Sequence, residues 1–149
     1  LGAIEAINGD PDRPANLQIP FAYRFFAGGR TTFRAVDTDR LGIPEQTIID
    51  DIAVGGNALI LINLEYRRRI VGEFFAAIFV DAGNVFSTNC RSSQRQCYDV
   101  DLNEIRYSVG IGATWITGFG PITFSVSQPL NAGDFDQEEV FQFTLGQGF

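Results

Sequence analysis

Apolar and polar residues alternate with a period of two over much of the second half of the chain, most clearly between residues 104 and 116. There Ile105, Tyr107 and Val109 share one face, while Ser108 and Gly110 lie on the other. Strict alternation over several residues is typical of β-strands. The same pattern predicts strands at about 57–67, 73–86, 104–116, 121–128 and 139–149.

The connections between these strands alternate between short turns and long polar loops. Strands of about nine to eleven residues joined in this way are the signature of an antiparallel transmembrane β-barrel, whose small polar face lines the interior. Aromatic residues near the short-turn end fit an interfacial girdle: Tyr66, Phe74, Trp115, Phe119 and Phe149. A soluble antiparallel sandwich carries similar apolar faces and stays open as the alternative. Because the smallest barrels have eight strands, we expect a barrel here to include strands from outside this chain.

The segment at about 8–53 shows no persuasive period, and its centre is the run RFFAGGRTTFRAV at 24–36. The adjacent Gly28 and Gly29 interrupt either regular period and allow positive backbone dihedrals, so the run predicts a shaped loop. A single arginine, Arg34, follows Phe33. Long segments without regular structure are usually functional, and one that combines aromatic residues with a central charge is expected to occupy a cavity.

Composition narrows the function classes. The net charge of −7 argues against a nucleic-acid partner. The sequence has no His, no G-x-S-x-G elbow and no metal-ligand cluster, so we expect neither an enzyme nor a cofactor or metal site. No window reaches the roughly 18 consecutive apolar residues of a membrane helix. No signal peptide opens the chain, and Leu1 already lies in a strand-like pattern, so we expect a piece of a larger protein.

The two cysteines, Cys90 and Cys97, are seven residues apart in the polar run CRSSQRQC. Zinc sites draw their ligands from several Cys and His residues, and this sequence has no His and no further Cys. A local disulfide in an oxidising compartment is therefore favoured over a zinc site.

The run RFFAGGRTTFRAV resembles the sixth extracellular loop of the outer-membrane β-barrel assembly factors of the BamA/TamA family. In that family the run is typically aromatic-aromatic-x-Gly-Gly-x-x-x-Val-Arg-Gly-aromatic. The resemblance continues, in the same order, through VGGNALILINLEY (54–66), FFAAIFVDAGNVF (74–86), IRYSVGIGATWITGFGPITFSVSQPLN (105–131) and FQFTLGQGF (141–149). It departs from the pattern at Ala35 and Val36, where the family has glycine and an aromatic residue. Since alanine resists positive φ, the loop tip is expected to differ.

The resemblance implies a sixteen-stranded barrel in the bacterial outer membrane, of which residues 1–149 form the C-terminal portion. Residues 8–53 would then be loop six, folded into the barrel lumen, and the short turns would face the periplasm. The long loops, including the one that carries both cysteines, would be extracellular.

The resemblance also implies partners for the loop motif formed by Gly28, Gly29, Phe33 and Arg34. In the family, the arginine of the loop meets an acidic residue on strand thirteen, which corresponds to Asp81. Alternation places Phe79 on the same face as Asp81, and Glu65 on the neighbouring strand is a second expected partner. The alternatives are a solvated Arg34, an Asp81 paired with Arg106, and a Glu65 that is an ordinary solvated charge.

The last predicted strand resembles the C-terminal signal by which barrel precursors are recognised. Phe141, Phe143 and Phe149 would face lipid, and Gly146 would face the interior. In the family this strand is also one side of a lateral gate. The alternative is that these phenylalanines only contact lipid, and the gate cannot be inferred from them because strand one is absent from the chain.

The expected function is that of an assembly factor which folds and inserts outer-membrane β-barrel proteins without ATP. The expected partners are unfolded outer-membrane proteins, the lipid bilayer, POTRA domains of the same protein and accessory lipoproteins. The alternatives are a two-partner-secretion translocator and the barrel anchor of a patatin-like lipase. The upstream region discriminates between them: several POTRA repeats, two POTRA repeats after a plug helix, or an α/β-hydrolase-like domain.

Overall fold

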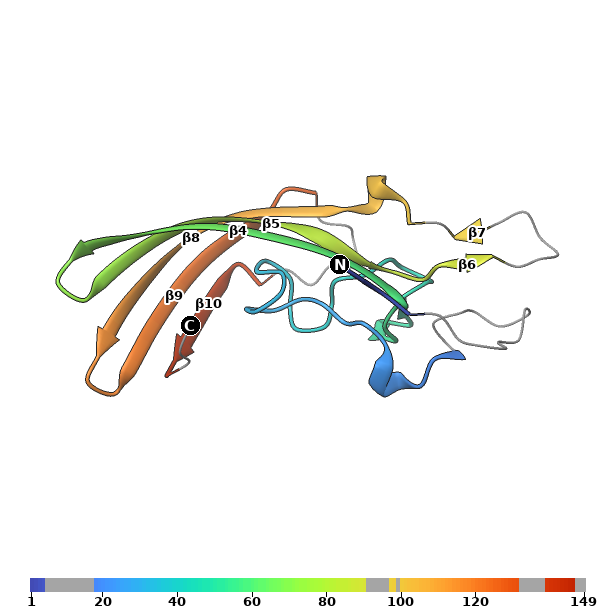
Figure 1. Ribbon diagram of the computed structural model, residues 1–149, viewed down its shortest axis with the longest axis horizontal. Coiled ribbons are helices and arrows are strands. Elements are labelled where there is room, and N and C mark those ends of the chain that lie inside the picture. The colour runs from blue at the N-terminus through green and yellow to red at the C-terminus, as the bar shows by residue number, and fades with distance from the viewer. Residues whose placement is uncertain (5–17, 91–96, 99, 132–138, 147–149) are drawn as a thin grey trace.

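The computed structural model describes residues 1–4, 18–90, 97–98, 100–131 and 139–146. Its centre is one six-stranded antiparallel sheet with the order β1-β4-β5-β8-β9-β10. The strands are β1 (Gly2–Ala3), β4 (Ala58–Val71), β5 (Phe74–Phe86), β8 (Arg106–Thr117), β9 (Gly120–Pro129) and β10 (Phe141–Leu145). The sheet curves strongly along its strands, and residues 18–53 lie within its concave side (Figure 1).

The long strands pair in an almost unbroken register. Asn63 of β4 lies opposite Asp81 of β5, and Asp81 lies opposite Ser108 of β8. β4 runs four residues beyond the predicted end at 67, and its pairing with β5 continues through the three arginines. One register shift falls between Arg69 and Val71. β10 ends at Leu145, before the predicted end at 149. The next residue, Gly146, has a positive φ of 76°.

The two faces of the sheet carry opposite chemistry. Large apolar side chains on the convex face are exposed: Ile62 54%, Leu64 66%, Ile78 60%, Ile111 63%, Phe124 45% and Phe141 58%. Polar side chains on the concave face are buried: Asp81 0%, Ser108 0%, Thr114 4%, Ser127 1% and Gln142 2%. A soluble sandwich buries its apolar faces against a second sheet, whereas a membrane barrel presents them to lipid. The faces are therefore those of an outer-membrane barrel.

Residues 18–53 form an ordered loop with short elements of its own: η1 (Phe21–Tyr23), β2 (Ile48–Ile49) and β3 (Ile52–Ala53). Six buried residues make a small apolar core, and all but one belong to the loop: Ala27, Phe33, Ala35, Val36, Leu41 and Val85. Leu59 and Leu61 of β4 pack against this core. The loop is thus a packed plug against β4 and β5, which explains how a segment without a regular period is fixed.

Beyond the sheet, β6 (Asn89–Cys90) and β7 (Cys97–Tyr98) form a short antiparallel pair, and η2 (Leu102–Glu104) precedes β8. Cys90 lies directly opposite Cys97 in the register of this pair. The side chains of both cysteines lie outside the described residues, so the disulfide stays a prediction.

Candidate functional site

The centre of the site is an ion pair between the loop and β5. The Nε of Arg34 donates to Oδ2 of Asp81 at 2.9 Å, and Nη2 donates to Oδ1 at 2.8 Å. The backbone N–H of Arg34 donates to the same Oδ2 at 3.0 Å. A guanidinium bound in this two-pronged way is held in both distance and orientation. The structure thus brings together the two residues that the resemblance had paired, and Asp81 does not pair with Arg106 instead.

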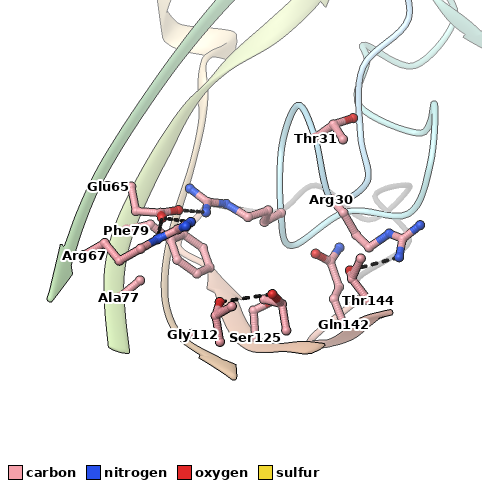
Figure 2. Close-up of a pocket in the computed structure, with 13 residues that line it drawn as sticks. Arg30, Thr31, Glu65, Arg67, Ala77, Phe79, Gly112, Ser125, Gln142 and Thr144 are labelled. Atoms are coloured by element: carbon pink, nitrogen blue, oxygen red, sulfur yellow. Dashed lines mark hydrogen bonds and ion pairs between the residues drawn. The ribbon is translucent and has the colours of Figure 1, made fainter. Parts of the chain in front are cut away.

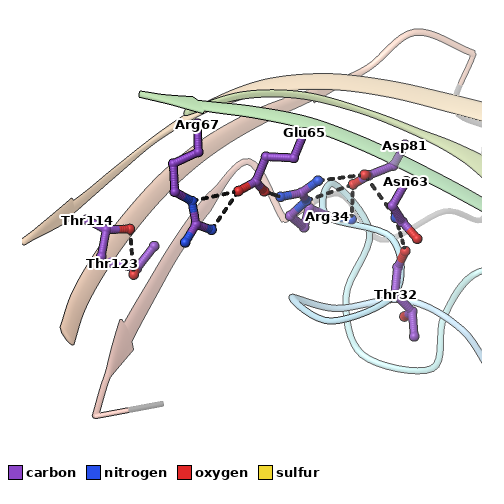
Figure 3. A network of polar contacts seen from close by, with 8 residues as sticks. All are labelled: Thr32, Arg34, Asn63, Glu65, Arg67, Asp81, Thr114 and Thr123. Atoms are coloured by element: carbon purple, nitrogen blue, oxygen red, sulfur yellow. Dashed lines mark hydrogen bonds and ion pairs between the residues drawn. The ribbon is translucent and has the colours of Figure 1, made fainter. Parts of the chain in front are cut away.

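Asp81 is fully buried, so a missing hydrogen bond would leave a charged group without compensation. A fourth bond comes from Asn63, directly opposite on β4, whose Nδ2 donates to Oδ1 of Asp81 at 2.9 Å. The same Nδ2 donates to the backbone oxygen of Thr32 at 2.7 Å. Asn63 therefore orients the carboxylate of Asp81 and attaches the loop to β4 at a second position, Thr32 (Figure 3).

Glu65 extends the network toward the short-turn end of β4. Its Oε2 accepts from Nη1 of Arg34 at 2.5 Å, and its Oε1 accepts from Nε and Nη2 of Arg67 at 3.0 and 2.6 Å. Burial on its own lowers the pKa of Arg34, but the hydrogen bonds and charges of Asp81 and Glu65 outweigh burial and raise it. Arg34 is therefore a permanent cation with two anionic partners.

The ring of Phe79 lies under the guanidinium of Arg34. The Cζ atom of Arg34 is 3.5 Å from the ring centroid, within the range of a cation–π contact. Phe79 itself lies flat across the sheet because its neighbour on β8, Gly110, has no side chain. A Cβ added at Gly110 would stand 2.2 Å from Cζ of Phe79. This glycine is thus part of the site, and the sequence pattern did not single it out.

The paired glycines of the loop shape the turn that presents Arg34. Gly28 has φ 122° and Gly29 has φ 81°, a region that disfavours residues with a Cβ. A Cβ at Gly28 would lie 2.2 Å from the backbone oxygen of Asp37. Phe33 is completely buried in the core of the loop. The structure thus gives these three motif residues the role of shaping and anchoring the loop.

Ala35 and Val36, which depart from the family pattern, fit the loop as it stands. Both are buried, at 0% and 1% exposure, within the loop core. Ala35 is not among the residues with positive φ, so the steric objection to alanine does not arise in this backbone. Its carbonyl accepts from the N–H of Glu139 at 3.0 Å, just before β10.

A second arginine of the loop, Arg30, contacts β10, the last strand in the order of the sheet. Its Nη1 donates to the backbone oxygen of Phe143 at 3.1 Å and to Oγ1 of Thr144 at 2.9 Å. Sequence reasoning missed Arg30, because nothing in the spacing of an exposed loop arginine indicates that it contacts a strand more than a hundred residues away. Asn63 and Arg67 were not singled out from the sequence either, although alternation along 57–67 places both on the same face as Glu65.

A cavity of about 220 Å³ lies between the loop and the concave face. Glu65, Arg67, Ala77 and Phe79 line one side of it, Arg30, Gln142 and Thr144 line the other, and Gly112 and Ser125 lie between them (Figure 2). Arg34, Thr114 and Thr123 complete the lining. Charged and hydroxyl groups keep this space wettable. Among the described residues that line the cavity, the charged side chains are held by ion pairs and hydrogen bonds, and no nucleophile is paired with a base.

The predicted signal residues of the last strand are placed on its outer face where they are described. Phe141 and Phe143 are 58% and 45% exposed and flank Phe124, with ring centroids 6.4 and 5.0 Å away. Gly146 directly follows β10 and does not lie within the strand as predicted, because its positive φ ends the extended conformation. Phe149 lies outside the described residues.

In the described part of the chain, no group of three or more His, Cys, Asp or Glu side chains is arranged to hold a metal ion. Over the same residues, no helix has the length and apolar character needed to cross a membrane.

The exposed apolar face, the polar concave face and the plugged interior define an outer-membrane β-barrel protein with a loop folded into its lumen. The sequence matches the Omp85 superfamily domain over residues 4–149, so the chain belongs to that superfamily. The predicted antiparallel barrel class, the family and the outer-membrane location are thereby confirmed.

Several relatives are outer-membrane protein assembly factors named BamA. The chain is 29% identical to the one from Neisseria meningitidis serogroup B over 89% of its own length and 19% of the relative. It is 28% identical to the one from Neorickettsia risticii over 88% of its length and 17% of the relative. The chain thus spans less than a fifth of these curated relatives.

The fold is also similar to a solved structure. The crystal structure of BamA from Haemophilus ducreyi lacking POTRA domains 1–3 superposes with a TM-score of 0.71 at 26% sequence identity. The match covers 86% of this chain and 27% of that one.

Proposed function

We propose that the chain is part of a non-enzymatic factor that folds and inserts β-barrel proteins into the outer membrane. The observation that carries this proposal is the loop pinned inside the barrel wall by Arg34, Asp81 and Glu65. Three relatives named outer-membrane protein assembly factor BamA favour this function over a secretion translocator or a lipase anchor.

The partners proposed for the whole protein are unfolded outer-membrane proteins, the lipid bilayer, POTRA domains of the same protein and accessory lipoproteins. The apolar convex face supports the proposed contact with lipid, because exposed side chains such as Ile62, Leu64 and Ile111 are compatible with the hydrocarbon core of a bilayer. We also propose that β10, with Phe141 and Phe143 on its outer face, is the last strand of a sixteen-stranded barrel.

The test uses the full-length protein reconstituted into vesicles with an unfolded β-barrel substrate and no ATP. The parent is expected to speed folding of the substrate, and Arg34→Ala and Asp81→Ala are each expected to reduce that rate at least tenfold. The double variant Arg34→Asp with Asp81→Arg is expected to recover part of it, because the pair is restored in reversed order. A parent that leaves the folding rate equal to that of empty vesicles would exclude the assembly function.

A control variant is Arg40→Ala. Arg40 lies in the same loop and bonds to Asp51, with no hydrogen bond or ion pair to the sheet among the described residues. Arg40→Ala removes one positive charge, as Arg34→Ala does, but it leaves the ion pair between Arg34 and Asp81 of β5 intact. We expect it to retain the activity of the parent.

A further inference from the structure

Three consecutive arginines alternate between the two faces of the sheet near the end of β4, at the left of Figure 1. Arg67 and Arg69 belong to the concave face and pair with Glu65 and Glu73. Arg68, between them, lies on the convex face and is exposed. Its side chain takes part in no ion pair and no hydrogen bond among the described residues. Within that part of the chain, the charge of Arg68 is therefore not neutralised.

The surroundings of Arg68 on the convex face are uncharged. Tyr66 lies two residues before it on the same face, and the register places Ala76 of β5 directly opposite. Ala76 is too short to cover the guanidinium, and its neighbours on this face, Phe74 and Ile78, are apolar. Neither β4 nor β5 carries an acidic side chain on the convex face. A counter-ion for Arg68 is thus not supplied by this hairpin.

Lipid covers the convex face, because the chain belongs to an outer-membrane superfamily and the apolar side chains of this face are exposed. An arginine that faces lipid is costly unless its charged end lies at the membrane interface. The stacked rings of Phe74 and Trp115, 5.4 Å apart, mark that interface close to Arg68. The anions that lipid offers at an interface are the phosphates of its headgroups.

The side chains of Arg68 and Tyr66 are suited to a phosphate. A guanidinium donates two parallel hydrogen bonds to phosphate oxygens, which a single ammonium group cannot do. Tyr66 lies about 7 Å away along the strand, is 64% exposed and has no hydrogen-bond partner for its hydroxyl among the described residues. That hydroxyl is a further donor on the same face. The two residues together offer a charge and three donors to one anionic group.

We propose that Arg68 and Tyr66 form a binding site for an anionic glycerophospholipid on the outer surface of the barrel. The guanidinium holds two phosphate oxygens, the hydroxyl of Tyr66 donates to the headgroup, and the acyl chains lie against the apolar side chains of β4 and β5. The lipid thereby supplies the counter-charge that the hairpin lacks. This inference goes beyond the assembly function and needs only the outer-membrane location, so the two are tested separately.

The variants for the test lie at exposed positions, where substitutions have small effects on stability. Arg68→Gln removes the charge and the planar fork. Arg69→Gln is the matched control, because it removes the same charge one residue away on the opposite face. Arg68→Lys keeps the charge but loses the fork, and Tyr66→Phe removes only the hydroxyl.

The measurement is photo-cross-linking of lipid to the full-length protein in phosphatidylcholine vesicles. The two probes are phosphatidylglycerol and phosphatidylcholine with the same photoreactive acyl chains, each added at the same small mole fraction. Digestion with chymotrypsin and mass spectrometry assign each cross-link to the β4–β5 hairpin or to the β8–β9 hairpin. The β8–β9 hairpin is the internal control, because it has no charged residue between Tyr107 and Gln128.

The quantity compared is the yield with phosphatidylglycerol divided by the yield with phosphatidylcholine. In the parent we expect this ratio to be about fivefold higher at the β4–β5 hairpin than at the β8–β9 hairpin, the factor for one basic residue at an anionic membrane surface. Arg68→Gln is expected to make the two hairpins equal, whereas Arg69→Gln should match the parent. Arg68→Lys and Tyr66→Phe should give intermediate ratios.

Equal ratios at the two hairpins of the parent overturn the proposal. So does an equal loss in Arg68→Gln and Arg69→Gln, which would show a general attraction between the basic turn and the membrane. A ratio that Arg68→Gln leaves unchanged also overturns it, because Arg68 would then be paired with a carboxylate elsewhere in the protein. A parent that keeps the preference but does not fold barrel substrates supports the lipid site and rejects the assembly function.

Discussion

Arg34 and Asp81 meet through three hydrogen bonds, one from the backbone and two from the guanidinium, although 47 residues separate them along the chain. The side chain of Asp81 is completely buried and that of Arg34 is 16% exposed. The pair is thus one of few places where a loop without regular structure is fixed to a rigid sheet by directed bonds.

Removal of Asp81 is expected to cost more than removal of Glu65. Taking one partner from a buried ion pair costs roughly 3–5 kcal/mol, because the other charge is left without compensation. Asp81→Ala strips Arg34 of its bidentate partner, whereas Glu65→Gln leaves that bond intact and removes a charge whose side chain is 25% exposed. We expect Asp81→Ala to lower the free energy of unfolding by about 3 kcal/mol and Glu65→Gln by less than about 1 kcal/mol.

Urea titration of the full-length protein in vesicles measures both values, and limited proteolysis reports on the loop. Only Asp81→Ala is expected to open residues 18–53 to protease. Equal losses of stability in the two variants would show that Asp81 is not the main anchor.

Gly110→Ala is expected to weaken the site from a neighbouring strand. The new Cβ would stand 2.2 Å from the ring of Phe79, so the ring must move from beneath Arg34. Overpacking of this kind costs about 1–3 kcal/mol. Gly112→Ala, two residues along the same face, is the matched control, because its Cβ would approach no atom closer than 3.4 Å.

The free energies of unfolding of both glycine variants are compared with that of the parent. Gly112→Ala is expected to stay within about 0.5 kcal/mol. If Gly110→Ala were equally harmless, the contact between Phe79 and Arg34 would not depend on the space beside Gly110.

Alternation along the chain was sufficient to predict the five long strands and both of their faces, because period two is a local property of the sequence. It also placed Asp81, Phe79 and Glu65 on one face. The extension of β4 was missed because residues 68–72 were interpreted as a short connection, since three consecutive arginines interrupt the alternation of apolar and polar residues. Inward arginines are allowed there because Glu65 and Glu73 pair with them.

The arrangement of the loop was not predictable in the same way. The family resemblance named Arg34 and its partner, but the core formed by Phe33, Ala35 and Val36 depends on packing against Val85 and Leu59. The contact from Arg30 to Phe143 likewise depends on where the loop crosses the sheet. Such contacts are set by tertiary geometry, and neither spacing nor composition contains them.

Ala35→Gly, which restores the residue typical of the family, is expected to destabilise this loop. Ala35 does not need positive φ, and its methyl group is buried in the loop core. Glycine would lose that contact and increase the conformational freedom of the unfolded chain, at a cost of about 0.5–1 kcal/mol. Urea titration and protease protection of residues 18–53 are the measurements, and a gain in stability would contradict the backbone described for Ala35.

Arg68 is expected to be tolerated on the lipid-facing side only because it lies near the membrane interface. Register pairs it with Ala76, which places it on the convex face next to Tyr66. Among the described residues it has no ion-pair partner, whereas Arg67 pairs with Glu65 and Arg69 with Glu73. The stacked rings of Phe74 and Trp115, 5.4 Å apart, mark the aromatic girdle at this end of the sheet.

A charged residue on the lipid face costs about 2–4 kcal/mol at the bilayer midplane and only about 0–1 kcal/mol near the interfaces. Arg68→Leu is therefore expected to raise the free energy of unfolding in vesicles by no more than about 1 kcal/mol. Ile111→Arg, which places the same charge farther from the turn on a side chain that is 63% exposed, is expected to lower it by about 2–4 kcal/mol. Since both variants change the same face by one charge, the difference between them reports depth in the bilayer. If Arg68→Leu stabilised the protein by as much as Ile111→Arg destabilised it, Arg68 would lie in the hydrocarbon core and the girdle would be misplaced.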